Sequence, residues 1–138
     1  MRFMGSLALI AAVWCLEGCG GAGGPTVKEP GRIYIHNMTN GVHPVHASCM
    51  LEDDTYLEVD VPAGEKRDLT EKVGPLPGGT EVTVHIRTMG SATRAGKLSQ
   101  GGTCDRDVPV VVDGNVVIRI LEYRCWGASK IVYELAKE

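Results

Sequence analysis

Beyond residue 31, apolar and polar residues alternate along the chain, and no stretch has the spacing of an amphipathic helix. The clearest alternation covers residues 80–88, where Val82, Val84 and Ile86 fall on one face of an extended segment. Because successive side chains of a strand point to opposite faces, this pattern predicts strands with one buried face. Strands are predicted at residues 33–36, 44–51, 56–61, 80–88, 108–112, 116–123 and 129–135, and residues 66–73 form either a short strand or a helical turn.

Turn residues separate these segments about every ten positions. Seven or eight short strands with this punctuation predict an all-β fold, a small antiparallel β-sandwich that is Ig-like or similar, with a small barrel as the alternative. Asp113-Gly114-Asn115 is the strongest hairpin signal, between two valine-rich runs. Residues 89–102 are rich in glycine and serine, and we expect a long loop or an irregular edge strand there. With a single phenylalanine in the chain, the core should be aliphatic.

The N-terminus has a different pattern. Arg2 precedes a run at residues 3–16 that is almost wholly apolar but too short to span a bilayer, which is typical of an export signal. Its end, Leu16-Glu17-Gly18-Cys19, resembles the lipobox of bacterial lipoproteins. The resemblance implies that residues 1–18 form a signal helix that is removed and that Cys19 receives the lipid. The alternative is a plain secretory signal cleaved near the same glycines, which would leave a soluble protein.

Residues 19–31 are rich in glycine and proline and are predicted to be a flexible tether before the domain at residues 32–138. Two or three acyl chains on one cysteine hold a protein stably at a membrane, since each buried CH₂ contributes about 0.8 kcal/mol. We therefore expect a lipid-anchored protein of the cell envelope. In a Gram-negative host, the glycine after Cys19, where aspartate commonly marks inner-membrane retention, points to the outer membrane.

Charge and motifs narrow the expected function. The net charge of −3 argues against a nucleic-acid partner, which would favour a basic surface. The sequence has no Gly-x-Ser-x-Gly elbow and no other catalytic signature that we recognise, and it indicates no cofactor. We therefore expect a non-enzymatic domain that binds a protein or another envelope component.

Three cysteines remain after Cys15 and Cys19 are set aside, and exported cysteines are usually paired. With Gly114-Asn115 as a two-residue hairpin loop, Cys104 lies opposite Cys125 at a non-hydrogen-bonded pair, where side chains are closest. Pro109 opposes this register, because it occupies a hydrogen-bonded site without an N–H. The alternative is a bond from Cys49 to Cys125. Tyr123-x-Cys125 resembles the tyrosine two residues before the second cysteine of immunoglobulin domains.

His43, His46 and Cys49 carry ligand types that suit zinc or copper, and a metal-binding protein is the alternative function. Their spacing places them on one face only in a helix, whereas Pro44 and Val45 favour an extended segment. In a strand His46 points away from His43 and Cys49. His36 or His85 from a neighbouring strand would then have to complete the site.

Overall fold

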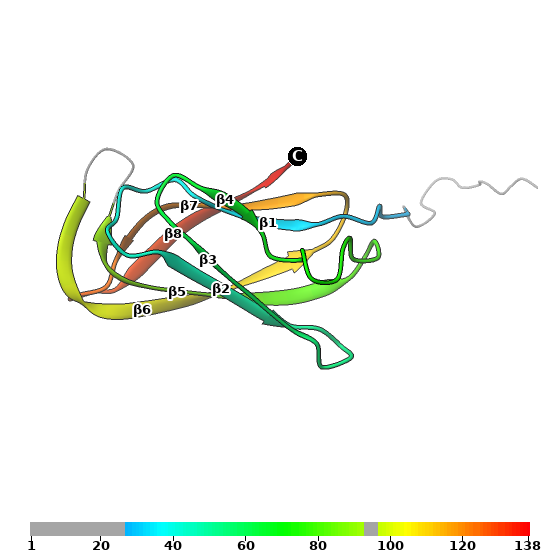
Figure 1. The fold of residues 1–138 in the computed structure, drawn as a ribbon, viewed down its shortest axis with the longest axis horizontal. Helices are drawn as coiled ribbons and strands as arrows, with labels where there is room; N and C mark the ends of the chain where they lie inside the picture. Colours follow the sequence, from blue (N-terminus) through cyan, green and yellow to red (C-terminus); the bar gives the residue numbers. More distant parts are fainter. Residues whose placement is uncertain (1–26, 93–96) are drawn as a thin grey trace, which may run out of the picture.

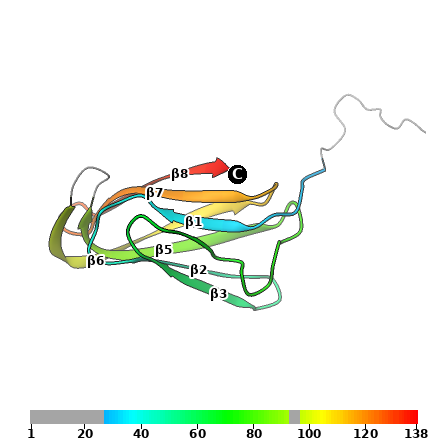
Figure 2. The same ribbon diagram turned by 45° about the horizontal axis from the view of Figure 1, so that its top comes forward.

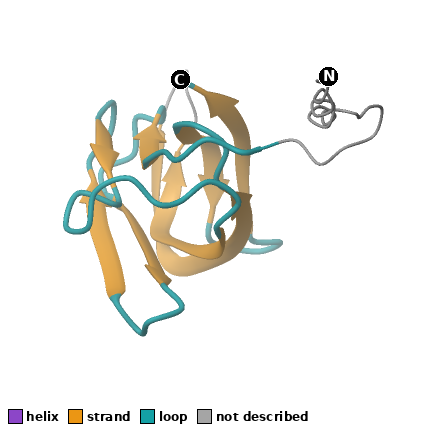
Figure 3. Ribbon diagram, turned by 90° about the vertical axis from the view of Figure 1, so that its right-hand side faces the viewer, coloured by secondary structure: helices purple, strands orange, loops and turns teal. Residues whose placement is uncertain are grey.

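In a computed structural model, the structure describes residues 27–92 and 97–138. The predicted signal segment and Cys19 lie outside the described residues. The described residues form eight strands: β1 (Ile33–Asn37), β2 (Val45–Met50), β3 (Tyr56–Val61), β4 (Lys66–Asp68), β5 (Glu81–Ala92), β6 (Lys97–Val111), β7 (Val116–Arg124) and β8 (Lys130–Lys137). The part of the chain coloured in Figure 3 consists of strands and loops, as the alternating pattern predicts.

The strands form two four-stranded sheets packed as a small β-sandwich, which confirms the predicted fold class. The first sheet has the order β3-β2-β5-β6 and the second has the order β4-β1-β7-β8. Figures 1 and 2 show them as two layers. A short pairing of Ser91 with Arg124 and Ala92 with Tyr123 joins β5 to β7 at one end. β1 and β7 run parallel, so the sandwich is not purely antiparallel as predicted.

The core between the sheets is aliphatic, as the composition predicts. Its most completely buried members come from both sheets and include Ile33, Ile35, Val84, Ile86 and Ile118. Tyr123 is the one aromatic side chain among the fully buried residues of the described chain. β-branched side chains fit this half-buried pleated surface, which explains why the alternation of valine and isoleucine marks the strands so well.

The hairpin predicted at Asp113-Gly114-Asn115 does not form, and that prediction is wrong. β6 pairs with β5 and β7 pairs with β1 and β8, so this turn carries the chain from one sheet to the other. The turn residues instead hold the segment that leads into β1. Asp113 accepts from the backbone N–H of Glu29, and Asn115 accepts from that of Arg32. These long-range bonds satisfy the polar turn side chains without a hairpin.

Of the two predictions for residues 89–102, the long loop is wrong for the described part of that segment, and an irregular edge strand forms there instead. β5 continues to Ala92 and β6 already begins at Lys97, so the two form a long antiparallel pair with an irregularity after Met89. Gly102 has a φ of +105° and lies against the backbone carbonyl of Cys125. Its missing side chain therefore allows a close approach of two strands rather than a loop. At residues 66–73, the strand alternative is correct for β4, which is followed by turns.

The N-terminal described segment meets the sandwich at the end opposite the one where β5 ends and β6 begins (Figure 1). Glu29 and Gly31 fall within the predicted tether but are hydrogen-bonded to the domain: Gly31 pairs with Leu76, and the carbonyl of Glu29 accepts from the backbone N–H of Gly114. The hydrogen-bonded domain therefore includes Glu29.

Candidate functional site

The outer face of the first sheet carries an ordered array of charged residues. One row across the strands is Asp60, His46, Arg87 and Asp105, and the next is Glu58, Ser48, His85 and Asp107. The acidic residues come from the edge strands β3 and β6, whereas the histidines and the arginine come from the inner strands β2 and β5. Cross-strand neighbours of opposite charge stabilise a sheet, so these pairs help to stabilise the order β3-β2-β5-β6.

Each histidine of the array lies between two carboxylates. His46 Nδ1 is 2.8 Å from Asp60 Oδ1, and its Nε2 is 3.5 Å from Glu58 Oε1. His85 is placed in the same way, with Nδ1 2.7 Å from Asp107 Oδ1 and Nε2 3.9 Å from Asp105 Oδ2. The two rings are thereby fixed against the edge strands. With neutral histidines, four carboxylates against one guanidinium make this face negative.

The second sheet has a different outer face. His36 on β1 pairs in register with Lys66 on β4 and with Arg119 on β7. Partial burial and the charges of Lys66 and Arg119 lower the pKa of His36 below its ordinary value of 6.5. Lys66 and Arg119 are themselves paired with Glu138 and Glu134. The two outer faces therefore differ in charge, and we consider the negative one as an interaction surface.

The three residues of the predicted metal site do not share one face of β2. His46 lies on the outer face, whereas Cys49 is buried at 4% exposure among the core side chains. Burial raises the pKa of the Cys49 thiol, which disfavours the thiolate that metals bind. His43 precedes β2 in the chain. Among residues 27–92 and 97–138, no group of three or more potential ligands is arranged to hold a metal ion.

A disulfide joins Cys104 to Cys125, which is the first of the two predicted pairings, and Cys49 remains a buried free thiol. The reasoning from a hairpin register is nevertheless wrong. Cys104 is on β6 of the first sheet and Cys125 follows β7 of the second, so the bond links the two sheets. Pro109 raises no conflict, because β6 is an edge strand and Pro109 lies opposite Thr83 of β5.

Arg106 fastens the same side of the sandwich as the disulfide. Its Nη1 donates to the backbone carbonyl of Ile131 at 3.0 Å, and its guanidinium lies 4.9 Å from the ring centre of Tyr133 on β8. We call this side, formed by Cys104 and Arg106 with Cys125, Ile131 and Tyr133, the closed side.

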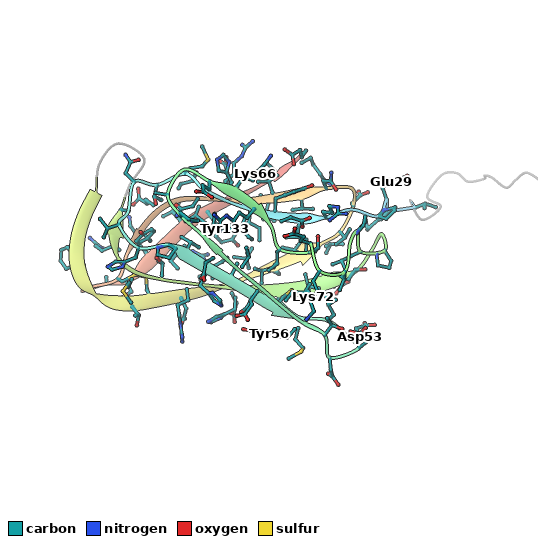
Figure 4. All side chains as sticks on the ribbon, in the orientation of Figure 1. Glu29, Asp53, Tyr56, Lys66, Lys72 and Tyr133 are labelled. Carbon is teal, nitrogen blue, oxygen red and sulfur yellow. A yellow bond between two sulfur atoms is a disulfide. The ribbon has the colours of Figure 1, made fainter. Side chains whose placement is uncertain are left out.

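On the other side of the sandwich, β3 and β4 are the edge strands, and an open groove of about 540 Å³ lies beside them. We call this the open side. Its lining consists of Tyr56, Leu57, Glu58, Val59, Asp68, Leu69, Glu71 and Lys72. Leu57 and Leu69 are almost fully buried and form an apolar floor. Figure 4 labels Tyr56 and Lys72 of this groove.

A larger groove of about 760 Å³ lies between the β2–β3 turn and residues 73–82. Leu76 and Gly78 of its lining also approach the incoming segment at Lys28 and Gly31. It therefore lies at the end of the sandwich where the N-terminal segment arrives. A partner would meet that segment there, whereas the open side lies along the flank of the domain.

No protein-family model matches the chain, and searches of curated proteins and of solved structures found no match. None of the described residues forms a helix that is long and apolar enough to cross a membrane.

The histidine–carboxylate array was not identified from the sequence, although a signal for it exists. Glu58 and Asp60, His85 and Arg87, and Asp105 and Asp107 are each spaced two residues apart, as side chains on one face of a strand are. The spacing shows which side chains share one face of a strand. It does not show which strands are neighbours, so it does not predict that the histidines and the carboxylates meet.

Proposed function

We propose that this chain is a lipid-anchored protein of a cell envelope, and that its β-sandwich binds a protein or another envelope component without catalysing a reaction. The observation that carries the proposal is the ending Leu16-Glu17-Gly18-Cys19 after a short apolar run. In a Gram-negative host, Gly20 favours the outer membrane.

The described domain supports export and anchoring. A disulfide such as Cys104–Cys125 is typical of proteins outside the reducing cytoplasm. The chain reaches the sandwich at one end, where Glu29 and Arg32 are bonded to residues 113–115. An anchor at Cys19 would attach the domain by that end and leave its flanks and its opposite end facing away from the membrane (Figure 1).

The surface of the domain supports binding. Its first sheet presents a negative outer face, and the grooves beside it are open to solvent. Small-molecule sites are commonly enclosed and converge on a few polar groups. An open flank with free strand edges suits an extended or macromolecular partner better.

The test of the proposal is the fate of Cys19 in the native host. We expect the mature protein to start at Cys19, to be heavier than its peptide chain by the acyl mass, and to sediment with membranes. Cys19→Ser should release it into the soluble fraction with an unchanged melting temperature, because Cys19 lies before the segment that bonds to the sandwich. Cys15→Ser is the matched control and should change neither property.

Two outcomes would contradict the anchor. An unmodified mature protein that starts near the same glycines would show a plain secretory signal. A Cys19→Ser protein that still sediments with membranes would show that another part of the chain holds it there.

A further inference from the structure

The four edge strands of the sandwich differ in how well they are protected. β6 contains Pro109 and is tied to the second sheet by Arg106 and by the disulfide. β8 receives the other end of the Arg106 bridge. β4 has only three residues, all of them charged. Proline, charge and short length are the usual protections against pairing with another chain, and β3 has the weakest set of them.

β3 pairs with β2, and among the described residues no strand pairs with its other edge. Arg67 Nη1 donates a hydrogen bond of 3.0 Å to the backbone carbonyl of Asp60 on this edge. The backbone N–H and C=O of one strand residue point to the same edge, and those of the residues two positions away point to that edge as well. Tyr56 and Glu58 therefore direct their backbone groups to the same free edge as Asp60. The edge available to a partner therefore starts at Tyr56 and ends before Asp60.

The groove of the open side lies directly beside this edge. A strand added to β3 would place alternate side chains over Leu57 and Leu69, on the apolar floor. The remaining side chains would point to the outer face, next to Glu58 and Asp60. Directly opposed cross-strand residues interact most strongly, so lysine or arginine is favoured at those outward positions.

A second copy of this chain fits the edge less well. In an antiparallel pairing centred on Glu58, that carboxylate would face its own counterpart, and like charges directly opposite destabilise a pair. The carboxylates beside this edge, Glu58 and Asp60, therefore select a basic partner over self-association.

On this basis, we propose that the free edge of β3 and the groove beside it bind an extended segment that alternates apolar and basic residues, as an added strand of the first sheet. This inference deepens the proposed binding function and rests on it. Main-chain hydrogen bonds would supply the attachment, and the groove and the carboxylates would select the sequence.

The probe is a short capped peptide that alternates valine and lysine, titrated at physiological ionic strength into the Cys19→Ser chain. We expect saturable binding. The same peptide N-methylated at every residue keeps its charge but has no backbone N–H to donate along either edge, and should lose binding. A valine–glutamate peptide should not bind.

Matched protein variants locate the site. Glu58→Lys should weaken binding at least about tenfold, equivalent to about 1.4 kcal/mol. Asp105→Lys makes the same charge reversal on the same face, beside His85 and at the opposite edge, and should leave affinity within about twofold of the parent. The soluble chain is used throughout, so failure of peptide binding is distinguishable from failure of the lipid anchor.

The proposal is overturned if the valine–lysine peptide does not bind, or if the N-methylated peptide binds equally well. It is also overturned if the two charge reversals weaken binding equally, which would show attraction by the whole face. Dimerisation that Glu58→Lys alters without any peptide binding would assign the edge to a second copy.

Discussion

The two long sides of the sandwich are built in different ways. On the closed side, a disulfide and the Arg106 bridge hold the first sheet to the second. On the open side, the Arg67–Asp60 bond lies at one end of an edge that borders a groove of about 540 Å³. The contrast predicts that stability is concentrated along β6 and β8, and it leaves one edge of β3 without a paired strand among the described residues.

The disulfide should make the largest contribution to this difference. It closes a loop with a sequence separation of 21 residues, for which chain-entropy estimates give about 3 kcal/mol. A Cys104→Ser and Cys125→Ser double variant should lose about 2–4 kcal/mol of unfolding free energy, measured by denaturant titration. Cys49→Ser is the control for replacing a cysteine by serine, because it leaves the disulfide intact. Since Cys49 is buried, this variant should lose a smaller amount of unfolding free energy. An unchanged midpoint in the double variant would show that the closed side does not depend on the bond.

Two arginines allow the sides to be compared directly. Arg106→Ala removes a partly buried bond to a carbonyl and a contact with Tyr133, and should lower the unfolding free energy by about 1–2 kcal/mol. Arg67→Ala removes exposed bonds to Asp60 and Glu65 and should lower it by less than about 1 kcal/mol. Equal losses in thermal unfolding would contradict the idea that stability is concentrated on the closed side.

The smallest effect concerns pH and His36, beside β4. Because burial, Lys66 and Arg119 lower its pKa in the folded state, the unfolded chain binds a proton at a higher pH than the folded chain does. Stability should therefore fall as the pH drops from about 6.5 to the lower folded-state value, with no contribution from His36 above that window. His36→Gln should flatten this part of the melting-temperature profile. A profile with the same slope in both proteins would contradict the assignment to His36.

Much of the fold could be predicted from local pattern, because its strands carry one buried face. Val82, Val84 and Ile86 mark β5 without any tertiary information, and Leu57 and Val61 mark β3. The parallel pairing of β1 with β7 could not be predicted, since alternation places residues on faces but does not identify the neighbouring strand. The hairpin predicted at Asp113–Asn115 does not form for a related reason. The polar side chains of this turn accept hydrogen bonds from Glu29 and Arg32, more than eighty residues earlier in the chain.

The candidate site was predictable only in part. Alternation places His46 and Cys49 on opposite faces of a strand, which argues against a shared metal, and the structure has the same arrangement. Asp60 and Glu58 become partners of His46 only because β2 and β3 pair in one register. The open edge depends on the order of all the strands, which the sequence pattern does not contain.

The most direct test of the contrast between the two sides is to locate the bound peptide. A nitroxide-labelled valine–lysine peptide would be added to the isotope-labelled Cys19→Ser chain, and the broadening of each amide signal measured by NMR. We expect broadening at residues 56–59 and 69–72 on the open side, with the amides of residues 103–108 on β6 unaffected. Broadening centred on β6 and β8, or spread evenly over the outer face of the first sheet, would contradict it.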